Sequence, residues 1–135
     1  MKTLTVDDEM VSRKKMKKIL DGFGECEACS TGSEALDLFR GALEKNDPFD
    51  LITLDISMPG IDGTGVLYEI RKIENEFGVP KEERIKVMMV TSRSDKATIT
   101  TCLQAGCNDY VLKPFDRGLM LRKLENLGIS LPQEA

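Results

Sequence analysis

The sequence predicts an α/β fold in which helices cover both faces of a parallel sheet. Strand-like and helix-like segments alternate five times along the chain, a pattern that builds right-handed βαβ units. Two of the strand-like runs, Phe49–Leu54 and Ile85–Val90, are apolar almost throughout, as expected of strands buried on both faces. The sequence shows no repeat, low-complexity segment or interior linker. We therefore expect one open, doubly wound sheet.

The predicted strands are short segments rich in β-branched and apolar residues. The second strand is placed around the spacing Cys26-x-x-Cys29, in which the two cysteines would point to opposite faces of the sheet. In chain order the predicted strands are Thr3–Val6, the segment around Cys26–Cys29, Phe49–Leu54, Ile85–Val90 and Tyr110–Leu112.

Helical periodicity and terminal signals place a helix after each strand. The second helix opens at Thr31-Gly32-Ser33, where Ser33 is the predicted N-cap, and Gly106 is the predicted C-cap of the fourth. The predicted helices run from about Val11 to Leu20, from Ser33 to before Asn46-Asp47-Pro48, from Gly63 to Phe77, from Asp95 to Ala105 and from Gly118 to Leu127.

Each predicted helix carries an apolar face that should pack on the sheet. Helix by helix, the residues expected on that face are Val11, Met16, Ile19 and Leu20; Ala35, Leu36, Phe39, Ala42 and Leu43; Val66, Leu67, Ile70 and Ile73; Ile99, Cys102 and Leu103; and Leu119, Leu121, Leu124 and Leu127.

Length and composition narrow the class of protein. The 135 residues are 41% hydrophobic and 31% charged, which fits one domain with a sizeable core. A net charge of −4, from 19 basic and 23 acidic residues, argues against non-specific nucleic-acid binding. The absence of histidine excludes imidazole catalysis, histidine metal ligands and a role as phosphohistidine donor.

The sequence favours a cytoplasmic protein without membrane insertion. Apolar runs such as Val87–Val90 are far shorter than a membrane span, and Asp7 and Asp8 stand where a signal peptide would be apolar. The four cysteines are then expected to be reduced thiols.

Polar residues follow the predicted strands at the edge where a doubly wound sheet binds its ligands. A single surface carboxylate is usually only solvated, but three that converge repel one another and are typical of a site for a hard divalent cation, best Mg²⁺. The strand-end residues are Asp7 and Asp8, Asp55, Thr91 and Ser92, and Lys113.

These residue types suit phosphoryl transfer to a carboxylate. Asp55 is the best-placed nucleophile for forming an aspartyl phosphate. The Thr91 hydroxyl could donate to a phosphoryl oxygen, and Lys113 could pair with that oxygen as a compact charge.

Five separated motifs resemble the CheY-like receiver domain of bacterial two-component response regulators, over about residues 2 to 127. Their joint order is far more specific than any one of them. The motifs are Thr5-Val6-Asp7-Asp8-Glu9, Leu54-Asp55-Ile56-Ser57-Met58-Pro59-Gly60, Asp62-Gly63, Val90-Thr91-Ser92 and Tyr110-Val111-Leu112-Lys113-Pro114-Phe115.

The resemblance implies a flavodoxin-like sheet of order 2-1-3-4-5 with five helices, and a role for each matching residue. Asp55 is the implied phosphoacceptor, and Lys113 contacts the phosphoryl group. Asp8 would bind Mg²⁺ directly and Asp7 largely through water. The backbone carbonyl of Ser57 would be the third protein ligand of Mg²⁺. The resemblance also implies that Thr91 and Tyr110 are the switch residues and that the Lys113-Pro114 bond is cis.

The function implied is that of a signalling domain and not of a metabolic enzyme. A histidine kinase or histidine phosphotransfer protein would phosphorylate Asp55, Thr91 and Tyr110 would switch the binding of a downstream protein, and the domain would slowly hydrolyse its own phosphoryl group. Dimerisation on phosphorylation stays open. We expect a receiver domain over residues 1–128 and a tail over 129–135, too short for an output domain, in a stand-alone regulator or a fragment.

Three features of the sequence are compatible with other functions. Asp62-Gly63-Thr64 is similar to part of the DxDGT motif of haloacid-dehalogenase-type phosphatases, but position 60 is Gly60 and the strand ends at Asp55. The Cys26-x-x-Cys29 spacing could indicate a metal or redox site. The basic run Arg13–Lys18 could be a solvated face, a docking face for the phosphodonor or, least favoured, a nucleic-acid patch.

Some residues depart from the family pattern or vary within it. Thr5 stands where an aliphatic residue is usual, Ser92 where alanine is common, and Val79–Arg84 lengthens the connection into the fourth strand. Ser57 and Arg93 flank the phosphorylation site at variable positions. Threonines 98, 100 and 101 make the fourth helix either an element that the switch moves or a marginal surface helix.

Overall fold

A parallel five-stranded sheet in the order β2-β1-β3-β4-β5 forms the centre of the computed structural model, which describes residues 1–92 and 96–129. This order confirms the predicted doubly wound α/β class. The elements are β1 Lys2–Val6, α1 Met10–Asp21, β2 Glu25–Cys29, α2 Gly32–Glu44, β3 Leu51–Asp55, α3 Gly63–Glu76, the 3₁₀ turn η1 Lys81–Glu83, β4 Lys86–Thr91, α4 Lys96–Gln104, β5 Asp109–Leu112 and α5 Arg117–Asn126.

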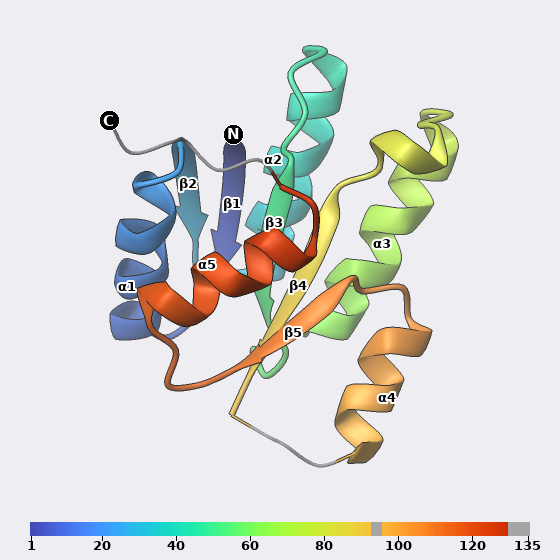
Figure 1. Ribbon diagram of the computed structural model, residues 1–135. Helices are drawn as coiled ribbons and strands as arrows, with labels where there is room; N and C mark the ends of the chain where they lie inside the picture. Colours follow the sequence, from blue (N-terminus) through green and yellow to red (C-terminus); the bar gives the residue numbers. More distant parts are fainter. Residues whose placement is uncertain (93–95, 130–135) are drawn as a thin grey trace.

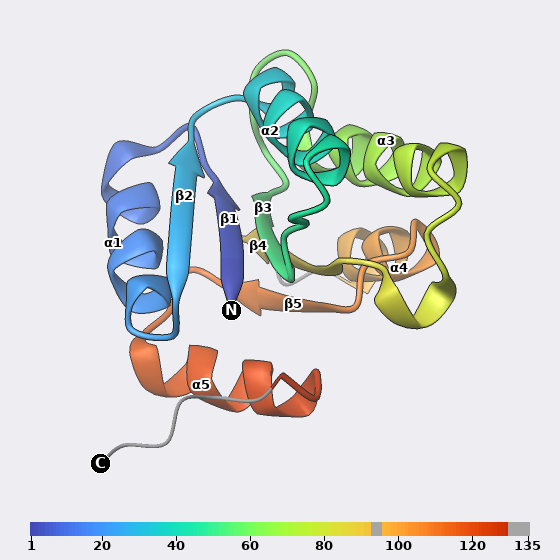
Figure 2. The same cartoon turned by 90° about the horizontal axis from the view of Figure 1, so that it is seen from above.

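The sheet separates two apolar layers. Helices α1 and α5 cover one face, and α2, α3 and α4 cover the other (Figures 1 and 2). Successive residues of β4 alternate between them, with Met88 packing in the α1/α5 layer and Met89 in the opposite one, because side chains along a strand alternate in direction. None of the helices in the described ranges is long and apolar enough to cross a bilayer.

Several predicted helix faces need correction. Val11 is 73% exposed, because a helix turns by 100° per residue and Val11 therefore lies roughly 140° around the helix from buried Met16. Leu103 is also exposed, beside buried Cys102. In α5 the fully buried residues are Met120, which the prediction left out, and Leu124.

One predicted helix start differs in the structure, and another lies outside the described residues. The N-cap of α2 is Thr31 and not Ser33. Thr31 has an extended backbone, and its hydroxyl accepts a hydrogen bond from the Glu34 N–H at 3.2 Å, the usual geometry of a threonine cap. The predicted start of the fourth helix at Asp95, like the flanking residue Arg93, lies outside the described residues, as does the predicted tail beyond Ile129.

A buried hydroxyl pair accounts for the unusual Thr5. The Thr53 hydroxyl on β3 donates to the Thr5 hydroxyl on β1 at 2.7 Å, and both side chains are buried. The two strands place Thr5 and Thr53 directly opposite each other. Thr5 is therefore tolerated because its neighbour supplies a matching polar group.

Thr5→Val should destabilise the protein by about 1–3 kcal/mol, because the Thr53 hydroxyl is left buried without its acceptor. The double variant Thr5→Val/Thr53→Val should recover most of that loss, since neither buried hydroxyl remains. Urea unfolding of the wild type, both single variants and the double variant measures the coupling. If the stability losses of the two single variants simply add in the double variant, Thr5 and Thr53 are not energetically coupled.

A second polar group, the Arg71 cluster, joins α3 to β4 and β5 and consists of Arg71, Glu74 and Asn108. Glu74 is 1% exposed; its Oε1 accepts from Arg71 Nη1 at 2.7 Å and its Oε2 from the Ile85 N–H at 2.8 Å. Arg71 Nη2 also donates to the Gly106 carbonyl at 3.0 Å and to Asn108 Oδ1 at 3.1 Å. The cluster thereby fixes the turn between α4 and β5 against α3.

Candidate functional site

The sheet brings the predicted site residues to one edge, at the carboxyl ends of the strands, which lie toward the bottom of Figure 1. Val6 pairs with Leu54, so Asp7 and Asp55 follow at the same level of neighbouring strands. Thr91 ends β4 and pairs with Leu112 on β5, which leads into Lys113. The Lys113 N–H donates to the Thr91 carbonyl at 2.8 Å.

Three carboxylates form the centre of the site. One oxygen each from Asp7, Asp8 and Asp55 lies within 4.8 Å of the others; Asp7 and Asp55 are buried, and Asp8 is exposed. Each of the two buried carboxylates also accepts a hydrogen bond from a backbone N–H group, Asp7 Oδ1 from Glu9 at 2.9 Å and Asp55 Oδ1 from Ser57 at 3.1 Å. An all-oxygen set of this kind fits Mg²⁺ better than a softer metal.

Lys113 supplies the positive charge of the site. Its Nζ lies 3.1 Å from Asp7 Oδ2, 3.3 Å from Glu9 Oε1 and 3.5 Å from Asp55 Oδ2. Burial acts to lower the pKa of Lys113, but its contacts with the three carboxylates outweigh burial and raise the pKa above its ordinary value. The side chain therefore stays charged at neutral pH.

Asp55 is the site residue whose protonation the surroundings change most clearly. Burial, followed by repulsion from Asp7, raises its pKa to about 7, although Lys113 and the Ser57 N–H act in the opposite direction. The carboxylate of Asp55 thus carries an unfavourable charge that a cation could offset.

The remaining predicted residues lie around this centre. Thr91 is buried, and Tyr110 is half-buried with Lys123 Nζ 4.9 Å from its ring centroid. Ser57 stands two residues after Asp55, and the role of its carbonyl stays a prediction. The peptide bond between Lys113 and Pro114 is cis, as the resemblance implied.

Two site residues, Glu9 and Gly63, belong to the motifs quoted from the sequence but were given no role there. Glu9 contacts Lys113 across most of the chain length. Gly63 begins α3 so close to β3 that an added Cβ would clash with the Asp55 carbonyl oxygen, so α3 can pack against β3 in this way only with glycine there. Its place in an Asp-Gly pair was the one available sequence signal.

Part of the basic run on α1 is committed to contacts within the protein. Arg13 Nη1 donates to the Asp7 carbonyl at 2.9 Å, Lys15 Nζ lies 5.2 Å from the Phe115 ring centroid, and Lys17 pairs with Asp21 at 3.0 Å. Arg13 therefore supports the backbone of the site.

The cysteine spacing does not form a joint site. Cys26 packs in the α1/α5 layer and Cys29 in the opposite layer, which confirms the prediction that they face opposite sides of the sheet. Burial raises the pKa of both thiols, that of Cys29 to about 12, so both are poor metal ligands and nucleophiles at neutral pH.

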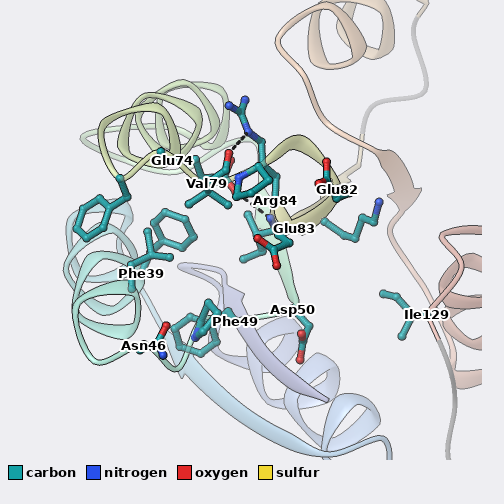
Figure 3. A pocket seen from close by; sticks show the side chains of 17 residues that line it. Phe39, Asn46, Phe49, Asp50, Glu74, Val79, Glu82, Glu83, Arg84 and Ile129 are labelled. Atoms are coloured by element: carbon teal, nitrogen blue, oxygen red, sulfur yellow. Dashed lines mark hydrogen bonds between the residues drawn. The ribbon is translucent and has the colours of Figure 1, made fainter.

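A pocket of about 610 Å³ lies at the opposite edge of the sheet. Phe49, Asp50, Ile85 and Lys86 line it where β3 and β4 begin. Figure 3 shows Phe39 and Phe49 on one side of the pocket and Glu82 and Glu83 on the other. The length of the strands therefore separates the pocket from the carboxylates of Asp7, Asp8 and Asp55.

Comparison with known proteins gives one consistent result. A family model described as the response regulator receiver domain matches residues 3–125. A chemotaxis protein CheY homolog of Campylobacter jejuni is 33% identical over 129 residues, which cover 94% of this chain and 92% of that protein.

Solved structures agree with this match. The receiver domain of the histidine kinase CKI1 from Arabidopsis thaliana, complexed with Mg²⁺, aligns with a TM-score of 0.79 and 30% identity over 91% of this chain and 90% of its own. The CheX-CheY-BeF₃-Mg²⁺ complex from Borrelia burgdorferi aligns with a TM-score of 0.81 over 96% and 90%, and at 24% identity it bears on the fold alone.

Proposed function

Because the chain belongs to the response regulator receiver family, we propose that it accepts a phosphoryl group on Asp55 and thereby changes which protein it binds. The observation that supports this most is the position of Asp55: a buried carboxylate within 4.8 Å of two others, with the Lys113 ammonium 3.5 Å away. The phosphatase alternative is not favoured. Asp62 is the N-cap of α3, where its Oδ1 accepts from the Gly65 N–H at 2.9 Å.

The proposed donor is a phosphohistidine on a histidine kinase or histidine phosphotransfer protein, since this chain has no histidine. An Asp55 carboxylate oxygen attacks phosphorus and forms the O–P bond. The N–P bond of the protonated phosphohistidine breaks, its electron pair stays on nitrogen, and neutral imidazole leaves. Lys113 would pair with a phosphoryl oxygen, and the Thr91 hydroxyl would donate to another.

Asp8, Asp7, Asp55 and the Ser57 carbonyl are the residues proposed to hold Mg²⁺, with Asp8 as a direct ligand and Asp7 acting largely through water. Bound Mg²⁺ offsets negative charge on the phosphoryl oxygens. The clustered carboxylates support this assignment, because their mutual repulsion is relieved by a divalent cation.

The proposed output is a two-state switch. A phosphoryl group on Asp55 would draw the Thr91 hydroxyl toward it and favour the buried position of Tyr110, which alters the surface offered to a downstream protein. Slow self-hydrolysis would end the signal. We further propose a cytoplasmic protein with its receiver domain over residues 1–128 and a tail over 129–135.

Intact mass spectrometry after incubation with acetyl phosphate tests the phosphoacceptor. We expect one added phosphoryl group in the wild type with Mg²⁺ and none when Mg²⁺ is chelated. Asp55→Asn should show none in either condition, because its amide is not a nucleophile. Asp62→Asn is the matched control: it removes a nearby carboxylate and keeps a good helix cap. Equal labelling of Asp55→Asn and wild type would refute the proposal.

A further inference from the structure

We propose that Glu9 is a positioning residue that competes with the incoming phosphoryl group for the Lys113 ammonium. The inference rests on the proposed function, because it concerns how Lys113 becomes available to a phosphorylated Asp55. Through this competition, Glu9 would slow the phosphorylation of Asp55.

Glu9 is held beside Lys113 from the start of α1. Its Oε1 accepts from Lys113 Nζ at 3.3 Å and from the Ser12 hydroxyl at 2.6 Å. Glu9 occupies the N-cap position of α1, yet its side chain makes no capping hydrogen bond. Its carboxylate is therefore directed to Lys113 and Ser12 instead of the helix end.

The ammonium of Lys113 is already surrounded by carboxylates in this arrangement, and it donates a hydrogen bond to Glu9. A lysine offers three N–H groups, and three carboxylates, those of Asp7, Glu9 and Asp55, lie 3.1 to 3.5 Å from Nζ. A phosphoryl oxygen that pairs with Lys113 must therefore compete with these three carboxylates for the ammonium.

Glu9 is the partner that costs least to release. The side chains of Asp7 and Asp55 are 6% and 9% exposed, whereas that of Glu9 is 63% exposed. Water can replace Lys113 at an exposed carboxylate, and an ion pair in such a position contributes little stability. Loss of the Glu9 contact would therefore accompany the movement of Lys113 onto the phosphoryl group.

Glu9→Gln should bind the phosphoryl mimic beryllofluoride more tightly than the wild type. Because an exposed ion pair contributes little, we expect the dissociation constant to fall by only about two- to fivefold. The rate of phosphorylation by acetyl phosphate should rise by a similar factor. Isothermal titration calorimetry in saturating Mg²⁺ measures the first quantity, and intact mass over time measures the second.

Two further variants separate the effect of the contact between Glu9 and Lys113 from the effect of negative charge near the site. Glu9→Asp keeps the charge, but its shorter side chain favours capping α1 and should lose Lys113, so it should behave like Glu9→Gln. Glu34→Gln is the matched control, since Glu34 is an exposed first-turn glutamate that accepts from Ser30 and Thr31 hydroxyls. It should behave like the wild type. Thermal unfolding of each variant checks that the fold is kept.

Three results would overturn the inference. Unchanged or weaker beryllofluoride binding by Glu9→Gln would show that Glu9 does not compete for Lys113. Wild-type behaviour of Glu9→Asp beside tighter binding by Glu9→Gln would show that only charge near the site matters. Failure of the wild type itself to bind beryllofluoride and accept a phosphoryl group would overturn the proposed function together with the inference.

Discussion

Arg71→Met should lower the free energy of unfolding by about 3–5 kcal/mol, because it leaves the Glu74 carboxylate buried without its cation. The side chain of Glu74 is 2% exposed, so water cannot take the place of the guanidinium. Three further hydrogen bonds from Arg71 are lost as well, two of them to the backbone carbonyls of Ile85 and Gly106.

The chain offers a matched control for this prediction. Arg40 pairs with Glu76 at 3.3 Å, and both side chains are nearly half exposed. Arg40→Met should therefore cost about 1 kcal/mol or less. Adding Glu74→Leu to Arg71→Met should restore part of the lost stability, since the unpaired charge is then removed. Urea unfolding measures all four proteins, and similar losses for Arg71→Met and Arg40→Met would contradict the prediction.

Asp55→Asn should make the metal-free protein more stable than the wild type at pH 8, by about 2 kcal/mol. The pKa of Asp55 is about 7 in the folded protein and about 4 in an unfolded chain. Below pH 4 the group is protonated in both states. As the pH rises from about 4 to 7, ionisation favours the unfolded chain, so the wild type loses stability in this window. This stability difference is half of the free energy that the pKa difference alone corresponds to, because water at the edge of the site screens the charge of Asp55.

Unfolding in the presence of a chelator at several pH values tests this expectation. The difference between Asp55→Asn and wild type should grow from near zero at pH 4 to its full value above pH 7. Asp62→Asn, which removes a carboxylate outside the cluster, should show no such growth. Saturating Mg²⁺ should stabilise the wild type more than Asp55→Asn, because ligand binding favours the folded state. A pH-independent difference would contradict the burial argument.

The centre of the site was predictable because it follows from topology. A residue at the last position of a parallel strand, or directly after it, lies at the carboxyl edge of the sheet whatever the details of packing. Asp7, Asp55 and Lys113 are such residues, and the strand register brings their side chains within contact distance. The buried stripe of α3, from Val66 to Ile73, was predictable for a similar reason, since its apolar spacing admits one inward face.

Other features depend on contacts that no local pattern records. The Arg71 cluster joins residues up to 37 positions apart, and Arg71 alone is indistinguishable in the sequence from any surface arginine. The contact between Glu9 and Lys113 spans 104 positions. Val11 was assigned to the inward face together with Met16, Ile19 and Leu20, but its angular position on α1 exposes it to solvent.

The division of the core into two layers gives each layer its own chemical reporter. The chain has no tryptophan, but Cys26 lies in the α1/α5 layer, whereas Cys29, Cys102 and Cys107 lie in the layer of α2, α3 and α4. A buried thiol reacts with an alkylating reagent only when its surroundings open. Single-cysteine variants would thus time the opening of each layer separately, and would show whether the two sides of the sheet unfold together or one before the other.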